Sequence, residues 1–130
     1  MRRTSRELAL QILFQREYTS QIDFDQFIAM LDEPVEKEVR DYTQKIVTGV
    51  SDNKESLDGW IQNASRHWKM ERMSVVDRTI LRIACYEIKI LNLKPHIAID
   101  EAVEIAKKYG NTDSGAFVNG ILDQIGKVPS

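Results

Sequence analysis

Cysteine, histidine and long apolar runs are all scarce in this chain, and each scarcity excludes a class of protein. Cys85 is the only cysteine among 130 residues, which excludes disulfide frameworks and cysteine-rich zinc sites. The two histidines, His67 and His96, lack metal-ligand spacing, so no metal site is expected. No apolar run approaches the roughly 20 residues that a membrane-spanning helix requires, so no membrane partner is expected.

Glycine-rich phosphate-binding motifs are also missing. Neither GxGxxG nor GxxxxGK[ST] occurs, although the chain has six glycines. Asp100, Glu101 and Asp113 fall near expected helix N-termini, where the helix dipole favours negative charge, so stability explains them before acid–base catalysis does. The sequence therefore predicts a binding protein rather than an enzyme, and no cofactor is expected.

The N-terminus and the lone cysteine bear on localisation. Basic residues precede an apolar stretch, as in a signal peptide, but Glu7, Gln11 and Gln15 interrupt that stretch at helical intervals. We interpret it as an amphipathic helix that stays in the mature protein. Cys85, in the apolar sequence IACYEI, is expected to be buried, and the compartment is expected to be the reducing cytoplasm.

Charge is distributed unevenly around a net value of −2. Residues 1–16 carry four arginines against one acid, and residues 66–94 carry seven basic against three acidic side chains. Residues 23–41 carry seven acids against two basic side chains. Such a separation can present a basic face to RNA. Scattered, solvated charge on helix faces explains the same pattern, and charge alone leaves both interpretations open.

Apolar residues recur at helical spacing along nearly the whole chain, and no alternating strand pattern appears. We therefore predict an all-α bundle of about seven helices. The helix that begins after Ser74 is apolar over most of its circumference, so it is expected to be central. Signals typical of helix N-termini occur at Thr4 with Glu7, Asp23 with Gln26, Pro34, Asp52 with Glu55, Ser74, Pro95 and Asp113.

Single positions predict further details of the packing. Gly49 lies on the apolar seam of the third helix, where the missing side chain allows another helix to approach closely. Gly110 is placed to form a left-handed helix C-cap. Trp60 and Trp68 are expected to be core anchors rather than base-stacking platforms. Residues 65–73 are the only plausible boundary within the single domain 1–130, dividing it into subdomains of about 1–65 and 74–130.

The first helix has two apolar stripes, although one suffices for an outer helix of a bundle. Its second stripe, spaced by four, is Leu10, Phe14 and Tyr18. Another part of the fold or a partner must bury it. A central position for this helix, a partner protein and a homodimer all remain open.

Three segments, RTILRIACYEI, AIDEAVEIAKKYG and DSGAFVNGILD, follow one another between residues 73 and 123, and RRTSRELALQILF opens the chain. In this order they resemble the NusB family, over nearly the whole chain, with residues 17–40 contributing little. The resemblance implies a NusB-like fold of two helical subdomains. It also implies a transcription antitermination factor that binds single-stranded boxA RNA together with NusE, a small-subunit ribosomal protein. This pair would join other Nus factors on RNA polymerase at ribosomal RNA operons.

The RNA contacts follow partly from chemistry and partly from the resemblance. Arginines at a flexible end and in the first helical turn can approach phosphates. Phe117 matches a family aromatic implicated in RNA contact, although a core phenylalanine stays an alternative. Asp113 matches an acidic position that tunes RNA affinity, and Ser114 at a helix N-terminus suits a phosphate oxygen. The predicted RNA-binding residues are Arg2, Arg3, Arg6, Asp113, Ser114 and Phe117.

For the partner protein, Phe14 and Asp77 match family positions at the NusE interface, and Leu10 and Tyr18 extend the same stripe. The sequence departs from the family in two ways: phenylalanine stands at position 14 where tyrosine is common, and Ala116 stands where a basic side chain is common. RNA affinity without the partner is therefore expected to be weak.

Two other functions fit the same sequence features. One is the RNA-binding domain of a ribosomal RNA cytosine methyltransferase, for which a chain ending at Ser130 leaves no room for the catalytic domain. The other is a protein-only helical adaptor whose basic ends are incidental. Retention of boxA RNA in a gel shift separates the adaptor from the RNA-binding proteins.

Overall fold

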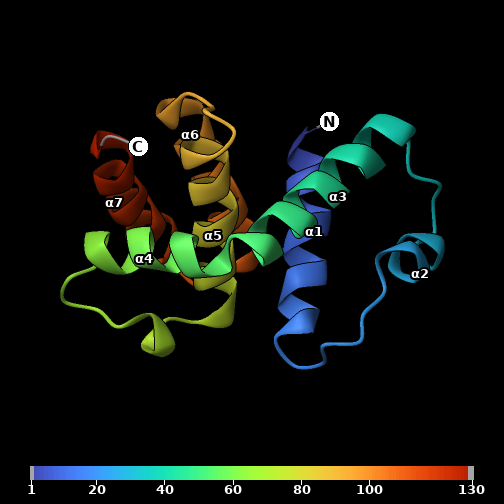
Figure 1. Ribbon diagram of the computed structural model, residues 1–130, viewed down its shortest axis with the longest axis horizontal. Helices are drawn as coiled ribbons and strands as arrows, with labels where there is room; N and C mark the ends of the chain where they lie inside the picture. Colours follow the sequence, from blue (N-terminus) through green and yellow to red (C-terminus); the bar gives the residue numbers. More distant parts are fainter. Residues whose placement is uncertain (1, 129–130) are drawn as a thin grey trace.

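The computed structural model describes residues 2–128, which are all-helical as predicted (Figure 1). None of its helices has the length and apolar character needed to cross a bilayer. Over the described range the elements are α1 (Arg2–Arg16), α2 (Phe24–Ala29), α3 (Lys37–Asp52), α4 (Lys54–Ala64), the short 3-10 helix η1 (Met70–Arg72), α5 (Val75–Lys89), α6 (Pro95–Tyr109) and α7 (Ser114–Lys127).

Helix α5 is the centre of the molecule, which confirms the prediction from its apolar circumference. It contacts α1, α3, α4, α6 and α7, and residues 79–89 are buried without interruption. The hydroxyl oxygen of Ser74 accepts a hydrogen bond from the Asp77 backbone N–H at 3.1 Å, so the predicted N-cap is present. Burial raises the pKa of the Cys85 thiol to about 12, which keeps this side chain protonated and unreactive.

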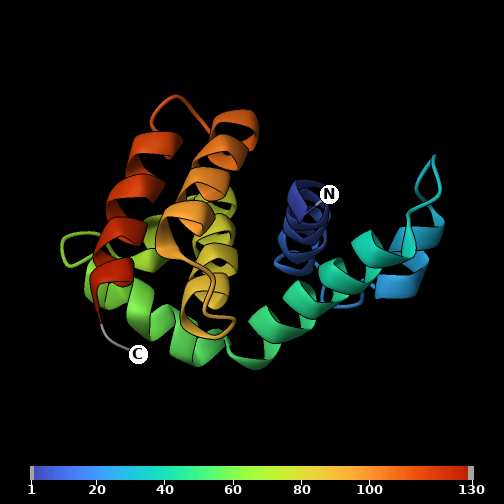
Figure 2. The ribbon, with the colours of Figure 1, turned by 90° about the horizontal axis from the view of Figure 1, so that it is seen from above.

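The helices form two groups (Figure 2). Helices α1, α2 and α3 lie on one side and α4 to α7 on the other, with α5 contacting α1 and α3 across the division. Helix α4 packs its buried Leu57 and Ile61 toward the second group, since α4 contacts α5 and α7. Helix α4, which ends before residues 65–73, therefore lies with the second group.

Two glycines allow close approach, one as expected and one for a different reason. A Cβ at Gly49 on α3 would overlap the Tyr86 ring on α5, so the predicted close helix contact is confirmed. Gly110 is not in the left-handed region, because its φ is −93°. A Cβ there would instead meet the Ser114 hydroxyl, so glycine is required for space rather than for its φ angle.

Three expected helix starts differ from the structure. Helix α1 already begins at Arg2, which places Thr4 inside the helix. Pro34 precedes α3, whose first residue is Lys37. Asp52 is the last residue of α3 rather than a cap of α4, so the capping spacing there had no structural meaning. Capping signals span only four residues and cannot show that one helix runs almost directly into the next.

Candidate nucleic-acid interface and partner surface

The first turns of α1 carry a buried ion pair. Arg6 is 4% exposed, and its Nε donates to the two carboxylate oxygens of Glu87 on α5 at 2.9 and 3.0 Å. The Tyr42 hydroxyl donates to the same carboxylate at 2.5 Å. Burial and this hydrogen bond raise the pKa of Tyr42 to about 12. Arg6 therefore lacks the solvent access that a phosphate contact needs, and the expectation of an accessible guanidinium here is corrected.

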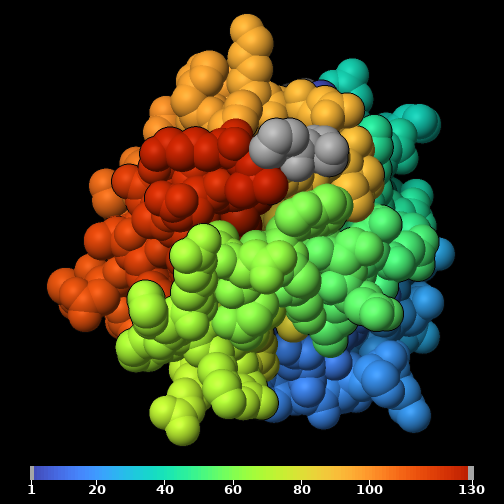
Figure 3. Space-filling model, turned by 60° about the vertical axis from the view of Figure 1, so that its left-hand side comes forward, coloured from blue at the N-terminus to red at the C-terminus, as the bar shows by residue number. Residues whose placement is uncertain are grey.

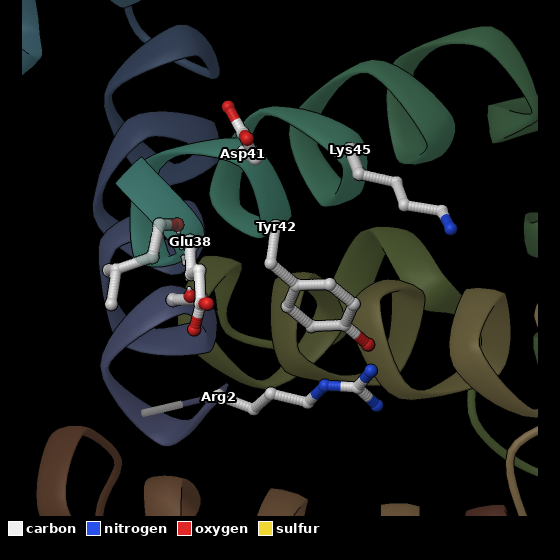
Figure 4. A pocket seen from close by; sticks show the side chains of 7 residues that line it. Arg2, Glu38, Asp41, Tyr42 and Lys45 are labelled. Carbon is white, nitrogen blue, oxygen red and sulfur yellow. Dashed lines mark hydrogen bonds between the residues drawn. The ribbon is translucent and has the colours of Figure 1, made fainter. Parts of the chain in front are cut away.

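Arg2 and Arg3 lie on the outer side of the same turn. Arg3 makes a two-point pair with Glu101 on α6, at 2.9 and 2.8 Å, yet its side chain is 49% exposed. The hydrogen bond from Arg3 lowers the pKa of Glu101. The Arg2 guanidinium lies 4.6 Å from the centre of the Tyr42 ring (Figure 4). Both arginines remain accessible to an RNA phosphate.

A hollow of about 410 Å³ between α1 and α3 adjoins Arg2 (Figure 4). Tyr42 and Lys45 line it, but so do the carboxylates of Glu38 and Asp41. Two carboxylates disfavour a polyanion inside this hollow. The α6 side of Arg2 and Arg3 is therefore a more favourable place for a polyanion than the hollow beside α3.

Helix α6 contacts the first turns of α1 through its side chains and is followed in sequence by α7. Beyond the Arg3–Glu101 pair, Lys108 at the end of α6 donates to the Glu7 carboxylate at 2.7 Å. The Lys107 and Lys108 side chains are 68% and 62% exposed. The chain then turns directly into α7, so exposed basic groups of α1 and α6 lead to Asp113.

At the start of α7, the adjacent residues Asp113 and Ser114 differ in exposure. Asp113 is exposed at the N-cap position of α7, and its side chain makes no capping hydrogen bond. Ser114 is buried, and its hydroxyl donates to Asn111 Oδ1 at 3.3 Å and accepts from the Asn111 N–H at 3.0 Å. The expectation that this hydroxyl suits a phosphate is thus corrected, because it holds the turn before α7.

Phe117, one turn further along α7, is half-buried against the core. Its ring meets the Trp68 ring edge-on, with centroids 6.1 Å apart and an interplanar angle of 67°. Trp68 is 53% exposed, so the prediction of a core tryptophan was wrong at this position. Sequence reasoning missed Trp68 as a functional candidate, although the basic residues around it in SRHWKMER were a signal.

On the other end of α1, the expected partner stripe is shorter than predicted. Leu10 is 2% exposed and belongs to the core, so it is corrected from a partner-binding to a structural residue. Phe14 is half-buried and Tyr18 is 71% exposed, with ring centroids 5.3 Å apart. Phe14 and Tyr18 form the accessible aromatic pair.

Asp77 lies on the first turn of α5, a helix that contacts α1. Glu17 at the end of α1 accepts hydrogen bonds from Arg78 at 3.1 Å and from Arg82 at 3.4 Å, which fixes the end of α1 against the start of α5. Asp77 is only 7% exposed, rather than on an open polar stripe as expected. Among the described residues, its Oδ1 is the one buried side-chain atom that has no hydrogen-bond partner. A buried carboxylate oxygen without a hydrogen-bond partner lowers the stability of the fold.

Comparisons with known proteins agree with this architecture. The sequence model of the NusB family matches residues 3–127. The transcription antitermination protein NusB of Bdellovibrio bacteriovorus is 56% identical over 128 residues, which cover 97% of this chain and 95% of that protein.

Two solved structures share the fold. T. maritima NusB superposes with a TM-score of 0.87 at 38% identity, covering 98% of this chain and 91% of that one. A chain in the crystal structure of the antitermination factors NusB and NusE with double-stranded RNA superposes with a TM-score of 0.84 at 26% identity. That match covers 97% of this chain and 96% of the other.

Proposed function

The chain belongs to the NusB family of transcription antitermination proteins, and from this membership we propose that it binds RNA together with a NusE protein. The RNA is single-stranded boxA, and the pair joins other Nus factors on RNA polymerase at ribosomal RNA operons, in the cytoplasm. The protein acts by binding, with no catalytic step and no cofactor. The similar chain found with NusE and double-stranded RNA supports both partners.

The observation that carries the RNA part is a line of exposed or half-buried groups from α1 to α7. It begins with Arg2 and Arg3, continues over Lys108 and ends at Asp113 and Phe117. Cations along this line supply salt-sensitive affinity for phosphates, and an accessible ring supplies stacking on a base.

A gel shift tests the proposal directly. A boxA-like strand, a scrambled strand and a double-stranded RNA are each titrated with the protein, with and without NusE. We expect the boxA-like strand to bind best, and NusE to strengthen its binding. Retention of none of the three RNAs, alongside normal binding of NusE, would instead favour a protein-only adaptor.

Replacing Arg2 and Arg3 by glutamine should weaken RNA binding and flatten its salt dependence. Each phosphate contact on a single strand contributes a slope of roughly −0.7, so the slope should fall by up to about 1.4. The measurement is fluorescence anisotropy at several salt concentrations. Lys37→Gln with Arg40→Gln removes the same charge on α3 and should leave the slope unchanged. Equal weakening by both double variants would show that only net charge matters.

Asp113→Asn should tighten RNA binding slightly, because it removes a negative charge from the proposed phosphate path. The variant loses a favourable helix-dipole interaction worth about 0.3–1 kcal/mol. Because the Asp113 side chain makes no capping hydrogen bond, the loss of stability should lie near the lower end of this range. Anisotropy and a melting curve measure the two effects, with Asp123→Asn on the same helix as the charge-matched control. Weaker RNA binding by the folded Asp113→Asn protein would contradict the proposed path.

A further inference from the structure

The segment between α4 and α5 presents one exposed aromatic side chain among cations. A hollow of about 390 Å³ is lined by His67, Trp68, Lys69 and Arg72. Arg66 is exposed beside them, and Glu71 is the one acid between residues 65 and 72. In the space-filling view this yellow-green segment lies beside the red helix α7 (Figure 3).

Hydrogen bonds from α4 fix this segment in place. The Ser65 hydroxyl donates to the Trp68 carbonyl oxygen at 2.7 Å, and Gln62 Nε2 donates to the same oxygen at 3.0 Å. The Met70 N–H donates to Gln62 Oε1 at 3.0 Å, and the Met70 side chain is buried in the core. Trp68 is therefore held out in solvent by an ordered backbone. A residue whose backbone is ordered in this way loses little backbone entropy when it binds a ligand.

The geometry of the ring pair limits what Trp68 can bind. Because the Trp68 and Phe117 rings are inclined at 67°, a flat base cannot stack on both of them at once. Each ring offers its own face, and the two faces lie at neighbouring positions, 6.1 Å between centroids. That separation suits consecutive unstacked nucleotides of a single strand.

We propose that Trp68 is a second base-stacking residue, which takes the nucleotide next to the one at Phe117 while Lys69 and Arg72 bind its phosphates. This inference rests on the proposed RNA-binding function and extends its site from α7 to the segment before η1. Positive charge beside an exposed indole favours a nucleic acid over an acid-poor or apolar protein surface. A double helix, whose bases stay stacked, would not engage Trp68.

Tryptophan fluorescence gives a direct test, because the chain has only two tryptophans. The variant Trp60→Phe leaves Trp68 as the sole tryptophan, and a boxA-like strand should quench its emission. The variant Trp68→Phe keeps only the half-buried Trp60, whose emission should not change. Trp68→Ala should weaken binding of the strand roughly 5- to 150-fold, the range that base stacking gives, and Trp68→Phe should restore part of it.

Binding of double-stranded RNA should be unaffected by Trp68→Ala, and a melting curve accompanies each variant. If the unaltered protein binds the strand but Trp68 emission stays constant and Trp68→Ala binds equally well, the inference fails while the proposed function stands. Loss of NusE binding with RNA binding intact would make Trp68 a protein contact, which also overturns the inference. If Trp68→Ala does not fold, the quenching experiment decides alone. If the unaltered protein binds no RNA, both proposals fail.

Discussion

Arg6→Ala should lower the free energy of unfolding by about 3–5 kcal/mol, the cost of removing one partner from a buried ion pair. Arg6 and Glu87 are 4% and 1% exposed, so the substitution leaves a carboxylate buried. Among the residues that the structure describes, only the Tyr42 side chain would still donate to it. Urea unfolding measures the change. Arg3→Ala is the matched control, because its pair with Glu101 is partly solvated and should contribute far less to stability than the buried pair.

The same variants decide what Arg6 does. If Arg6→Ala unfolds like the unaltered protein but binds RNA poorly, Arg6 contacts phosphate and its buried pair opens on binding. Replacing Arg6 and Glu87 together by methionine removes both charges, so much of the lost stability should return. A double variant as unstable as the single one would mean that the pair is not the source of the cost.

Phe14→Asp should reduce affinity for NusE by about 2 kcal/mol or more, roughly 30-fold, while the isolated protein keeps its melting temperature. Phe14 packs against Tyr18 outside the core cluster, so a carboxylate there stays hydrated in the free protein. In the complex it would be desolvated without a partner. A NusE titration and a melting curve measure the two effects, and Gln15→Asp supplies the same charge on an exposed neighbouring position.

Three outcomes contradict this placement of the partner surface. They are an unfolded Phe14→Asp protein, normal NusE binding by it, and equal losses in the Gln15→Asp control. Sedimentation without NusE tests for a homodimer. If the unaltered protein is a dimer and the Phe14→Asp protein is a monomer, the Phe14–Tyr18 ring pair mediates self-association. At Asp77 the informative change is Asp77→Asn, because it removes the charge without enlarging a side chain that is only 7% exposed.

Helical spacing was sufficient to predict the all-α fold, the central α5 and the caps at Asp23 and Ser74. These features depend on residues close together in sequence, or on one helix being apolar all round. The close contact at Gly49 followed from the same reasoning, because a glycine on an apolar seam leaves room for a neighbouring helix.

The candidate site was harder to predict, and α1 shows why. Arg6, Leu10, Phe14 and Tyr18 are spaced by four in the sequence, so sequence reasoning could not tell which of them are covered. The neighbouring helices enclose the first two and leave the last exposed. Coverage depends on where other helices begin and end, and those positions are set far away in the chain.

Residues outside regular helices gave still less information. Trp68 lies in a stretch without periodicity, so no face could be assigned to it, and its exposure results from hydrogen bonds to Gln62 and Ser65. The role of the Ser114 hydroxyl depends on Asn111, which turns toward it only in the folded loop.

The long-range pairs of α1 have a consequence for biosynthesis. Arg6 is separated by 81 residues from Glu87, Arg3 by 98 from Glu101, and Glu7 by 101 from Lys108. A ribosome that adds roughly 5–20 residues per second would take about 4–20 s to reach those partners. During that interval α1 can pack against α3, but Arg6 has no carboxylate partner. The nascent first helix is thus an amphipathic segment that chaperones can recognise, and its ion pairs form only when α5 and α6 have been made.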